Sequence, residues 1–196
     1  ESMTQFLGFN KYGDEYKVMG LAPYGKPSFL DKLRKILIQK ENGTYELNLD
    51  YYIFHKSYQN YEWENGEVKS FHLFSKKINQ LLGNPRNKGE DITQFHKDLA
   101  YSTQAIYEEA FFNLLNKIYQ KYQNKNICIA GGCGMNSVAN GKITKFTPFK
   151  NIYIHPAAGD AGGAIGAAYY TWHKILKKEK KFVMKHASWG NSYSND

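Results

Sequence analysis

Arginine is the scarcest of the charged residues in this sequence. The chain has 26 basic residues, and all but Arg34 and Arg86 are lysines. Nucleic-acid-binding faces concentrate arginine and lysine in one patch or stripe, whereas these lysines are scattered along the chain. We therefore expect no nucleic-acid partner for this chain of net charge +8, and we attribute its bias toward lysine over arginine to codon composition.

Long apolar runs and a recognisable leader are also missing. No stretch approaches the ~18 consecutive apolar residues of a membrane-spanning helix. The first residues, Glu1 to Phe6, show no basic segment followed by an apolar one, so we expect no signal peptide. We expect a cytoplasmic protein without a membrane partner. Because the first methionine is residue 3, we also expect this chain to be an excised segment.

Cysteine occurs twice, at Cys128 and Cys133. Two thiols without a second pair or a nearby histidine pair make at most half of a zinc site. A disulfide between them would have to close a very short loop. We expect one buried thiol and one loop thiol in a reducing compartment.

Apolar and aromatic residues are abundant enough for a packed core, at 42% and 16% of the chain. The length suits one domain or a piece of a larger one. The clearest element is a helix from Ile92 to about Tyr122, capped by Asp91, in which apolar residues recur at spacings of three, four and seven. These residues are Ile92, Phe95, Leu99, Ile106, Ala110, Leu114 and Ile118.

The other expected elements are shorter. Before the long helix, the pattern predicts a loop-rich start (1–27), a helix (31–39), one or two strands (45–54) and a helix (75–82). After it, we expect a buried strand (126–130), a helix starting at 135–143, a strand (152–154) and a closely packed helix (164–176). This order indicates an α/β fold with both glycine-rich turns at one edge of a sheet.

The first glycine-rich turn, with Gly131, Gly132 and Gly134, directly follows the strand at 126–130. Glycines there let a backbone approach a ligand closely, and a following helix can present its N–H groups to a phosphate. The spacing matches neither a P-loop nor a dinucleotide fingerprint. A tight strand-to-helix turn explains the glycines equally well. Asn136 could contact a ligand or simply cap the helix.

The second turn, Gly159-Asp-Ala-Gly-Gly163, sets one carboxylate among residues with almost no side chain. Asp160 could be a helix cap, which is the commoner role, or a metal or phosphate-site ligand facing the same crevice. His155 precedes it by five residues. We expect His155 to be an ordinary polar residue at a strand end rather than a metal ligand.

Several stretches together resemble the O-carbamoyltransferase family, which includes nodulation-factor and antibiotic-tailoring enzymes. The most distinctive is Gly13-Asp-Glu-Tyr-Lys-Val-Met-Gly-Leu-Ala-Pro-Tyr-Gly25. The others are Pro85-Arg86 with Gly89-Glu90, His96-x-Asp98-Leu-Ala100 with Gln104, Ala130-Gly-Gly132 with Asn136 and Val138-Ala-Asn-Gly141, and Pro156-Ala-Ala-Gly-Asp-Ala-Gly-Gly163. The resemblance covers nearly the whole chain and is weakest over residues 40–84.

The resemblance implies an actin-like, Hsp70-like and sugar-kinase-like ATPase fold, related to tRNA threonylcarbamoyl transferases. Residues 1–196 would be the later, C-terminal portion of the actin-like transferase domain. The upstream half, and a downstream domain that makes carbamoyl-adenylate from carbamoyl phosphate and ATP, would be absent from this chain. The implied activity is ATP-dependent transfer of carbamoyl from carbamoyl-adenylate to a hydroxyl of a sugar, an antibiotic or a related small molecule.

The family site holds a divalent metal of the iron type, with Mg or Mn as alternatives, through two histidines and one aspartate. Asp160 matches the aspartate, and the histidine pair would lie upstream of Glu1. The resemblance further implies nucleotide contacts from Gly131, Gly132, Gly134 and Asn136. Lys17 would steady the phosphate or ribose, unless it is a solvated loop lysine, and Tyr24 would form an aromatic wall.

No catalytic residue is assigned, and the fragment alone is expected to be inactive. A non-catalytic nucleotide-binding module of the same fold remains an alternative. A tRNA threonylcarbamoyl transferase relative is another, although the shortage of arginine argues against an RNA face. The acceptor is not determined by the sequence, and a homodimer stays open.

Overall fold

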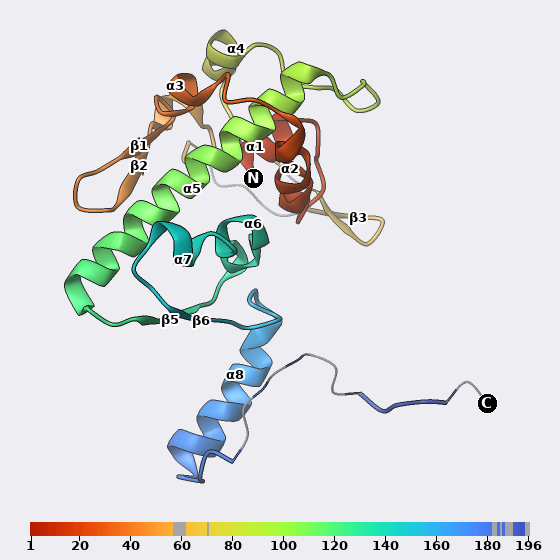
Figure 1. Cartoon of the computed structure of the whole chain (residues 1–196). Coiled ribbons are helices and arrows are strands. Elements are labelled where there is room, and N and C mark those ends of the chain that lie inside the picture. Colours follow the sequence, from red (N-terminus) through yellow and green to blue (C-terminus); the bar gives the residue numbers. More distant parts are fainter. Residues whose placement is uncertain (57–61, 70, 182–183, 185, 187–189, 195–196) are drawn as a thin grey trace. The chain divides into compact units, whose positions relative to one another are not determined.

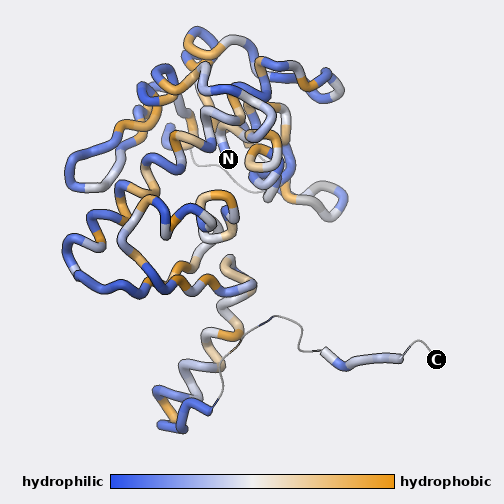
Figure 2. The backbone as a smooth tube through the Cα atoms, in the orientation of Figure 1, coloured by the Kyte–Doolittle hydropathy of each residue, from blue (hydrophilic) through white to orange (hydrophobic). Residues whose placement is uncertain are grey.

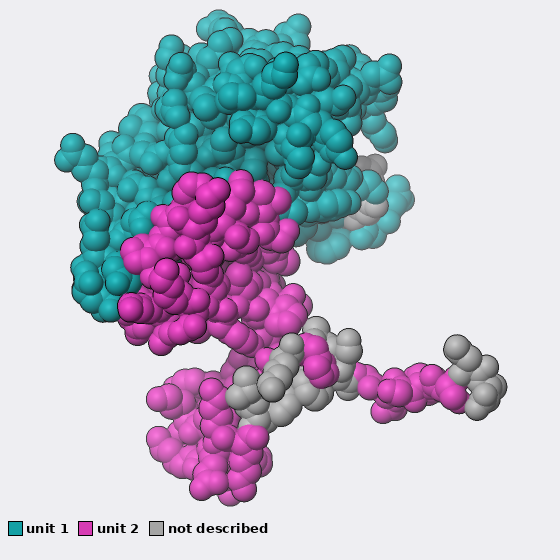
Figure 3. Space-filling view, in the orientation of Figure 1, with its two compact units in different colours: residues 1–123 teal, residues 124–196 magenta. Residues whose placement is uncertain are grey.

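The computed structural model describes the chain except for residues 57–61, 70, 182–183, 185, 187–189 and 195–196. The chain divides into two compact units, Glu1–Gln123 and Asn124–Asp196, which Figure 3 shows in different colours. Each unit mixes helices with short strands, so the α/β class predicted from the sequence is confirmed.

The first unit is built around one long helix (Figure 1). That helix is α5 (Gln94–Tyr122), and the other helical elements are α1 (Ser2–Phe6), α2 (Glu15–Leu21), η1 (Ala22–Tyr24), α3 (Leu30–Leu33), η2 (Leu49–Tyr51) and α4 (Lys76–Leu82). Two antiparallel hairpins complete the unit: β1 (Leu37–Gln39) with β2 (Tyr45–Leu47), and β3 (Glu62–Glu64) with β4 (Glu67–Lys69).

The core of the first unit lies along one side of α5. Leu99 and Ala100 are fully buried, together with Phe6 of α1 and Ile78 of α4. Hydrophobic and hydrophilic residues alternate along the α5 tube in Figure 2, as expected of a helix with one face on a core. Burying Leu99, Phe6 and Ile78 contributes roughly 1.5–3 kcal/mol each relative to exposure, so contacts of α5 with α1 and α4 stabilise the unit.

The expected long helix is confirmed, but its start and part of its buried face were predicted wrongly. α5 begins at Gln94, and Thr93 forms the cap: its side chain and that of His96 make a reciprocal capping box. A cap must stand directly before the first helical residue, so Asp91 lies too early. Ile92 is consequently outside the helix and exposed. Leu114 is exposed too, and its neighbour Leu115 is buried instead.

Local sequence signals failed most clearly before residue 54. The expected loop-rich start contains α1, α2 and η1. Pro23 does not prevent η1, because it stands in the first turn, where its missing N–H costs nothing. The expected helix at 31–39 shortens to α3. Its second half, β1, pairs instead with β2 across Asn42-Gly43, where Gly43 has φ +89°. The expected strand at 45–54 stops at Leu47, after which Asn48 caps η2.

The second unit contains a parallel pair of strands, β5 (Asn126–Ile129) and β6 (Asn151–Ile154). Its helical elements are η3 (Gly132–Met135), α6 (Ser137–Asn140), α7 (Ile143–Phe146), α8 (Gly162–Tyr170) and the π-helical turn η4 (Thr171–Ile175). The helix expected from 135 to 143 is thus split into α6 and α7. Asn136 caps α6 by accepting from the Ala139 N–H (3.0 Å), so regular helix begins only at Ser137.

Burial in the second unit was overestimated from the sequence. β5 was expected to be buried, yet its residues are exposed or half-buried. α8 was expected to be closely packed, yet none of its residues is buried within the part of the chain that is described. The physical reason is that these elements carry apolar and small residues while the described second unit offers only a two-stranded sheet to cover them.

Candidate functional site

The two glycine-rich turns meet at one edge of the β5–β6 sheet. The strands are parallel and in register, with Ile129 opposite Ile154, so their carboxyl ends lie side by side. The turns are joined directly, because the Gly131 N–H donates to the Ala158 carbonyl at 2.7 Å. The prediction that both turns share one sheet edge is confirmed.

A pocket of about 330 Å³ opens between these turns. Its lining residues are Ala130, Gly131, His155, Ala157, Ala158, Gly159, Asp160, Gly162 and Gly163. Nearly all of them lack a bulky side chain, so the wall is largely backbone. Such a wall suits a ligand that is recognised through main-chain groups, and the volume is that of a small-molecule site.

Some of these glycines are required by the fold itself. A Cβ at Gly162 would lie 2.1 Å from the Ala157 carbonyl oxygen, and one at Gly134 would lie 3.1 Å from Cγ2 of Ile129. Gly131 has φ +106°, a conformation that favours glycine. At these positions a tight turn explains the residue, as the sequence allowed.

Gly132 and Gly163 are different. A Cβ at either would meet nothing within 4 Å, and neither has a positive φ. Packing within the chain therefore does not require glycine at these positions. At Gly163, which lines the pocket, the missing side chain leaves open space in the pocket itself.

Asp160 lines the pocket with an exposed side chain. It does not cap α8, because Ala161 holds the N-cap position and no side-chain cap hydrogen bond is made there. The commoner of the two roles weighed for Asp160 is therefore wrong. Its carbonyl oxygen accepts from the Gly163 N–H at 3.0 Å, which fixes the backbone beneath the carboxylate. An exposed carboxylate at a pocket wall can accept hydrogen bonds or bind a cation.

His155 is tied to the second turn. Its Nδ1 accepts from the Ala157 N–H at 3.0 Å, so in the neutral ring the proton stands on Nε2. In this tautomer Nε2 is a hydrogen-bond donor, and the expectation that His155 is not a metal ligand stays a prediction. The same Nε2 is buried without a hydrogen-bond partner among the described residues.

The two cysteines lie on and just after β5: Cys128 is within the strand and Cys133 is in η3. Neither cysteine forms a disulfide, and both side chains are exposed. The expectation of a buried thiol on β5 is wrong, because Cys128 lies on the outward face of the strand.

Lys17 and Tyr24 lie in the first unit and are described with it. The Lys17 ammonium pairs with the Asp14 carboxylate at 2.6 Å, and Asp14 is buried, so Lys17 is not simply a solvated loop lysine. Tyr24 is 69% exposed at the end of η1. Within the Gly13–Gly25 stretch, residues 15–24 form α2 and η1, so the loop expected there is wrong.

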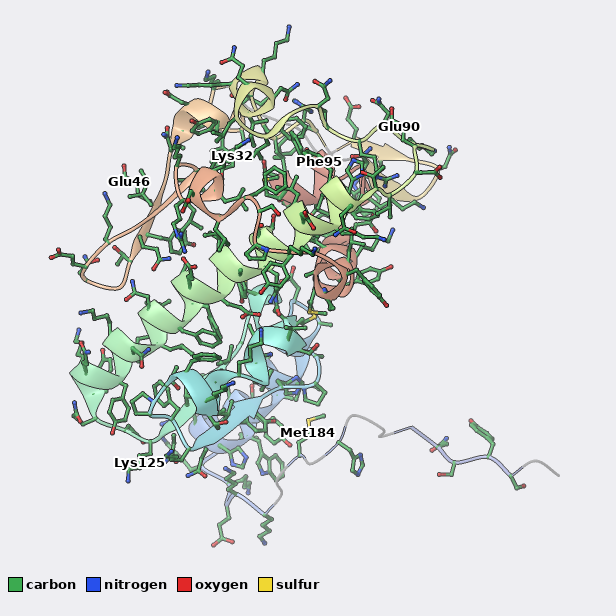
Figure 4. All side chains as sticks on the ribbon, turned by 45° about the horizontal axis from the view of Figure 1, so that its top comes forward. Lys32, Glu46, Glu90, Phe95, Lys125 and Met184 are labelled. Carbon is green, nitrogen blue, oxygen red and sulfur yellow. The ribbon has the colours of Figure 1, made fainter. Side chains whose placement is uncertain are left out.

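The structure assigns Asp98 a role that the sequence did not indicate. Its carboxylate accepts from the Lys26 N–H and the Ser28 hydroxyl, both at 3.0 Å, and from Gln94 at 2.7 Å. Just before this junction, Gly25 lies so close to α5 that a Cβ would be 2.0 Å from the Lys97 carbonyl oxygen. Farther along, Phe29 packs edge-on against Phe95, which Figure 4 labels on α5 near Lys32. Asp98 therefore anchors the end of the Gly13–Gly25 stretch on the long helix.

The described residues contain no group of three or more His, Cys, Asp or Glu side chains placed to hold a metal ion. Asp160 could therefore be only one ligand among several. None of the helices in the described ranges is both long and apolar enough to cross a membrane.

Comparison with known proteins identifies the family. The family model described as carbamoyltransferase N-terminus matches residues 1–169. The chain belongs to this carbamoyltransferase family. It is 40% identical over 194 residues to an uncharacterized protein of Synechocystis sp., covering 98% of this chain and 29% of that protein. The family resemblance found in the sequence is thereby confirmed.

Nodulation proteins are among the other relatives. The chain is 31% identical over 193 residues to nodulation protein NolNO of Sinorhizobium fredii, covering 98% of this chain and 25% of that one. It is 31% identical over 198 residues to nodulation protein NolO of Bradyrhizobium diazoefficiens, covering 98% and 31%. The chain thus spans between 25% and 31% of the length of these proteins.

Proposed function

We propose that this chain is part of an ATP-dependent O-carbamoyltransferase. The carbamoyl group would pass from carbamoyl-adenylate, made from carbamoyl phosphate and ATP, to a hydroxyl of a sugar, an antibiotic or a related small molecule. Family membership supports carbamoyl transfer in general. The observation that carries the finer proposal is the backbone-walled pocket at the sheet edge with Asp160 on its wall.

The pocket suits the departing phosphate of an adenylate. Carbamoyl transfer from a mixed anhydride requires the leaving phosphate to be held and its charge to be neutralised. The open space at Gly163 and the turn at Gly131 to Gly134 allow a phosphate to approach main-chain groups without a steric barrier. We assign the nucleotide to this side of the sheet.

Asp160 is proposed as one ligand of a divalent metal. An exposed carboxylate suits an iron-type, Mg or Mn ion. Because the described residues contain no cluster of three or more potential metal ligands, the other ligands would have to come from parts of the protein outside these residues. When bound, the metal would supply positive charge next to the phosphate. Asp160 itself would hold and orient that charge at the pocket wall.

The remaining candidate residues keep narrower roles. Asn136 already uses its amide oxygen to cap α6, so a nucleotide contact would be made in addition to that bond. Lys17 would reach a phosphate only by sharing or leaving its ion pair with Asp14. Tyr24 offers an exposed ring on which a base or sugar could stack. The actin-like fold, the placement of 1–196 in the later half of that domain, and a cytoplasmic location belong to the same proposal.

Metal content tests the proposal at Asp160. The full-length protein and its Asp160→Ala variant would be purified in parallel, and bound iron, manganese and magnesium measured by elemental analysis. We expect metal to fall to background in Asp160→Ala. The matched control, Asp91→Ala, removes an exposed carboxylate before another helix and should keep wild-type occupancy. Unchanged occupancy in Asp160→Ala would remove this residue from the metal site.

A further inference from the structure

A second cavity lies within the first unit, beside the loop that precedes α5. It has a volume of about 360 Å³. The residues that line it are Gln5, Asn10, His72, Phe74, Pro85, Arg86, Asn87 and Lys88. Two of them are permanently cationic, three are amides, and none is a carboxylate. Its size suits a small ligand and its composition suits an anionic one.

Arg86, one of the two arginines in the chain, is held rigidly at this cavity. Its Nε donates to the Leu7 carbonyl at 2.7 Å, Nη1 to the Glu90 carbonyl at 2.7 Å and Nη2 to the Gly8 carbonyl at 3.3 Å. The guanidinium also lies over the Phe9 ring, 5.1 Å from its centre. Three of its five N–H groups are thereby used, and the group's position is fixed before any ligand arrives.

The partners of Arg86 are neutral, so they do not cancel its charge. Carbonyl oxygens satisfy hydrogen bonds, and no carboxylate within the described ranges forms an ion pair with this guanidinium. Gly8 makes this geometry available: it has φ +77°, and a Cβ there would lie 3.0 Å from Nε of Arg86. The loop before α2 therefore wraps around a charge that stays electrostatically available.

The neighbouring charges leave the cavity positive. Lys88 is exposed on the same loop, and the His72 ring contacts the Phe74 ring in a tilted arrangement, with centroids 4.1 Å apart. Glu90, labelled in Figure 4, is the nearby anion; hydrogen bonds from Asn87 (2.9 and 2.6 Å) and the Arg86 charge lower the pKa of its carboxyl. Because both Glu90 oxygens accept from Asn87, that carboxylate is turned to its own loop. Arg86 and Lys88 outweigh it by one charge.

We infer that this cavity binds a small oxyanion, with a phosphoryl group as the best fit. Phosphoryl oxygens accept charge-assisted hydrogen bonds from guanidinium, ammonium and amide N–H groups, which are the groups that line the cavity. The inference does not depend on the nucleotide assignment, since every lining residue belongs to the first unit.

Oppositely signed substitutions test this site. Calorimetric titrations of the full-length protein would use inorganic phosphate, pyrophosphate and sulfate as probes. We expect Lys88→Gln to weaken phosphate binding roughly threefold and Glu90→Gln to strengthen it by a similar factor, as expected for one partly screened charge at close range. Lys121→Gln, an exposed lysine at the far end of α5, is the matched control and should bind like the wild type. Arg86 is left intact because it also holds the Gly8 loop.

Each outcome decides the matter. Equal affinity in Lys88→Gln and Lys121→Gln would overturn the site even if the wild type binds phosphate, since binding would then lie elsewhere. No response of the wild type to any probe would overturn it as well. Weakening of phosphate and sulfate alike would define a general oxyanion site, whereas weakening of phosphate and pyrophosphate alone would define a phosphoryl site. Loss of metal in Asp160→Ala without a change here would separate the two sites.

Discussion

Gly25 and Gly20 stand five residues apart in the Gly13–Gly25 stretch, yet the structure predicts opposite responses to alanine. At Gly25 a Cβ would lie 2.0 Å from the carbonyl oxygen of Lys97, 2.4 Å from its carbonyl carbon and 2.8 Å from the Asp98 nitrogen. All three atoms are backbone of α5 and cannot move aside alone. At Gly20, inside α2, a Cβ would meet nothing within 4 Å.

The size of the Gly25→Ala effect follows from the contacts that are lost when η1 moves away from α5. The η1 segment has to move away from α5 by roughly 1 Å, a distance that strains or breaks the Lys26-to-Asp98 bond (3.0 Å) and the Gln94-to-Tyr24 bond (3.3 Å). Each such bond contributes about 1 kcal/mol, and overpacking typically costs about 1–3 kcal/mol. We expect Gly25→Ala to lower the free energy of unfolding by roughly 2–4 kcal/mol.

Gly20→Ala should instead raise stability by roughly 0.5–1 kcal/mol, because alanine has the higher helix propensity and narrows the unfolded ensemble. Thermal unfolding followed by circular dichroism at a helix-sensitive wavelength would measure both, since α5 dominates the helical signal. For a chain of this size, about 1 kcal/mol shifts Tm by roughly 2–4 °C. If Gly25→Ala melts at or above the wild-type temperature, the close contact between η1 and α5 is refuted.

Three further predictions concern pH, the second turn and the chain alone. Burial, with the nearby Arg86 charge, lowers the pKa of His96 below 6.5 in the folded protein. The hydrogen bond from the Thr93 N–H to Nδ1 of His96 requires the neutral ring. The stability that this bond contributes is therefore present above pH 6.5 and is lost as pH falls through the lower folded pKa. Between pH 8 and pH 5, Tm should fall further in the wild type than in His96→Gln, because glutamine keeps the capping box without titrating. Parallel Tm curves for the two proteins would exclude a contribution of His96 titration to stability. His155→Asn retains an acceptor for the Ala157 N–H and should unfold within about 0.5 kcal/mol of the wild type, whereas His155→Gln should lose about 1 kcal/mol in urea unfolding; the reverse order would contradict the assigned bond. Residues 1–196 alone should show background carbamoyl transfer and weak metal binding, and robust turnover would show that the metal site is not divided.

The sequence predicted the elements whose signals are local and strong. The long helix over α5 follows from a periodic apolar pattern, and Leu99, Ile106 and Ala110 are buried as that pattern requires. Ser75 caps α4 as a serine before a helix should. The parallel strands and their glycine turns were also predictable, because a strand, a glycine turn and a helix recur twice in order.

The sequence could not predict which of two local signals would win. Residues 34–39 carry helical spacing, but pairing of Leu37 with Leu47 across a turn places them in a hairpin. The Gly13–Gly25 stretch reads as loop because of its glycines and proline. Packing of α2 and η1 on α5 makes it helical instead.

At the candidate site, residue types were readable and residue roles were not. The sequence named Gly131, Gly134 and Asp160, but it could not separate a glycine required by packing from one that leaves open space. That distinction needs the distance from each Cβ position to atoms far away in the chain. Likewise, Asp98 is an ordinary helical carboxylate until the fold brings Lys26 and Ser28 to it.

By itself, the sequence determined the family, the α/β class and the order of the two turns, because these depend on residue type and on neighbours in the chain. Only the tertiary structure decided three further points. Asp160 does not cap α8, Nδ1 of His155 accepts a hydrogen bond so that the neutral ring carries its proton on Nε2, and Arg86 lies at a cavity without an ion-pair partner among the described residues. The physical reason is common to all three. Burial, hydrogen bonding and charge balance are set by residues distant in the sequence, and folding alone brings these together.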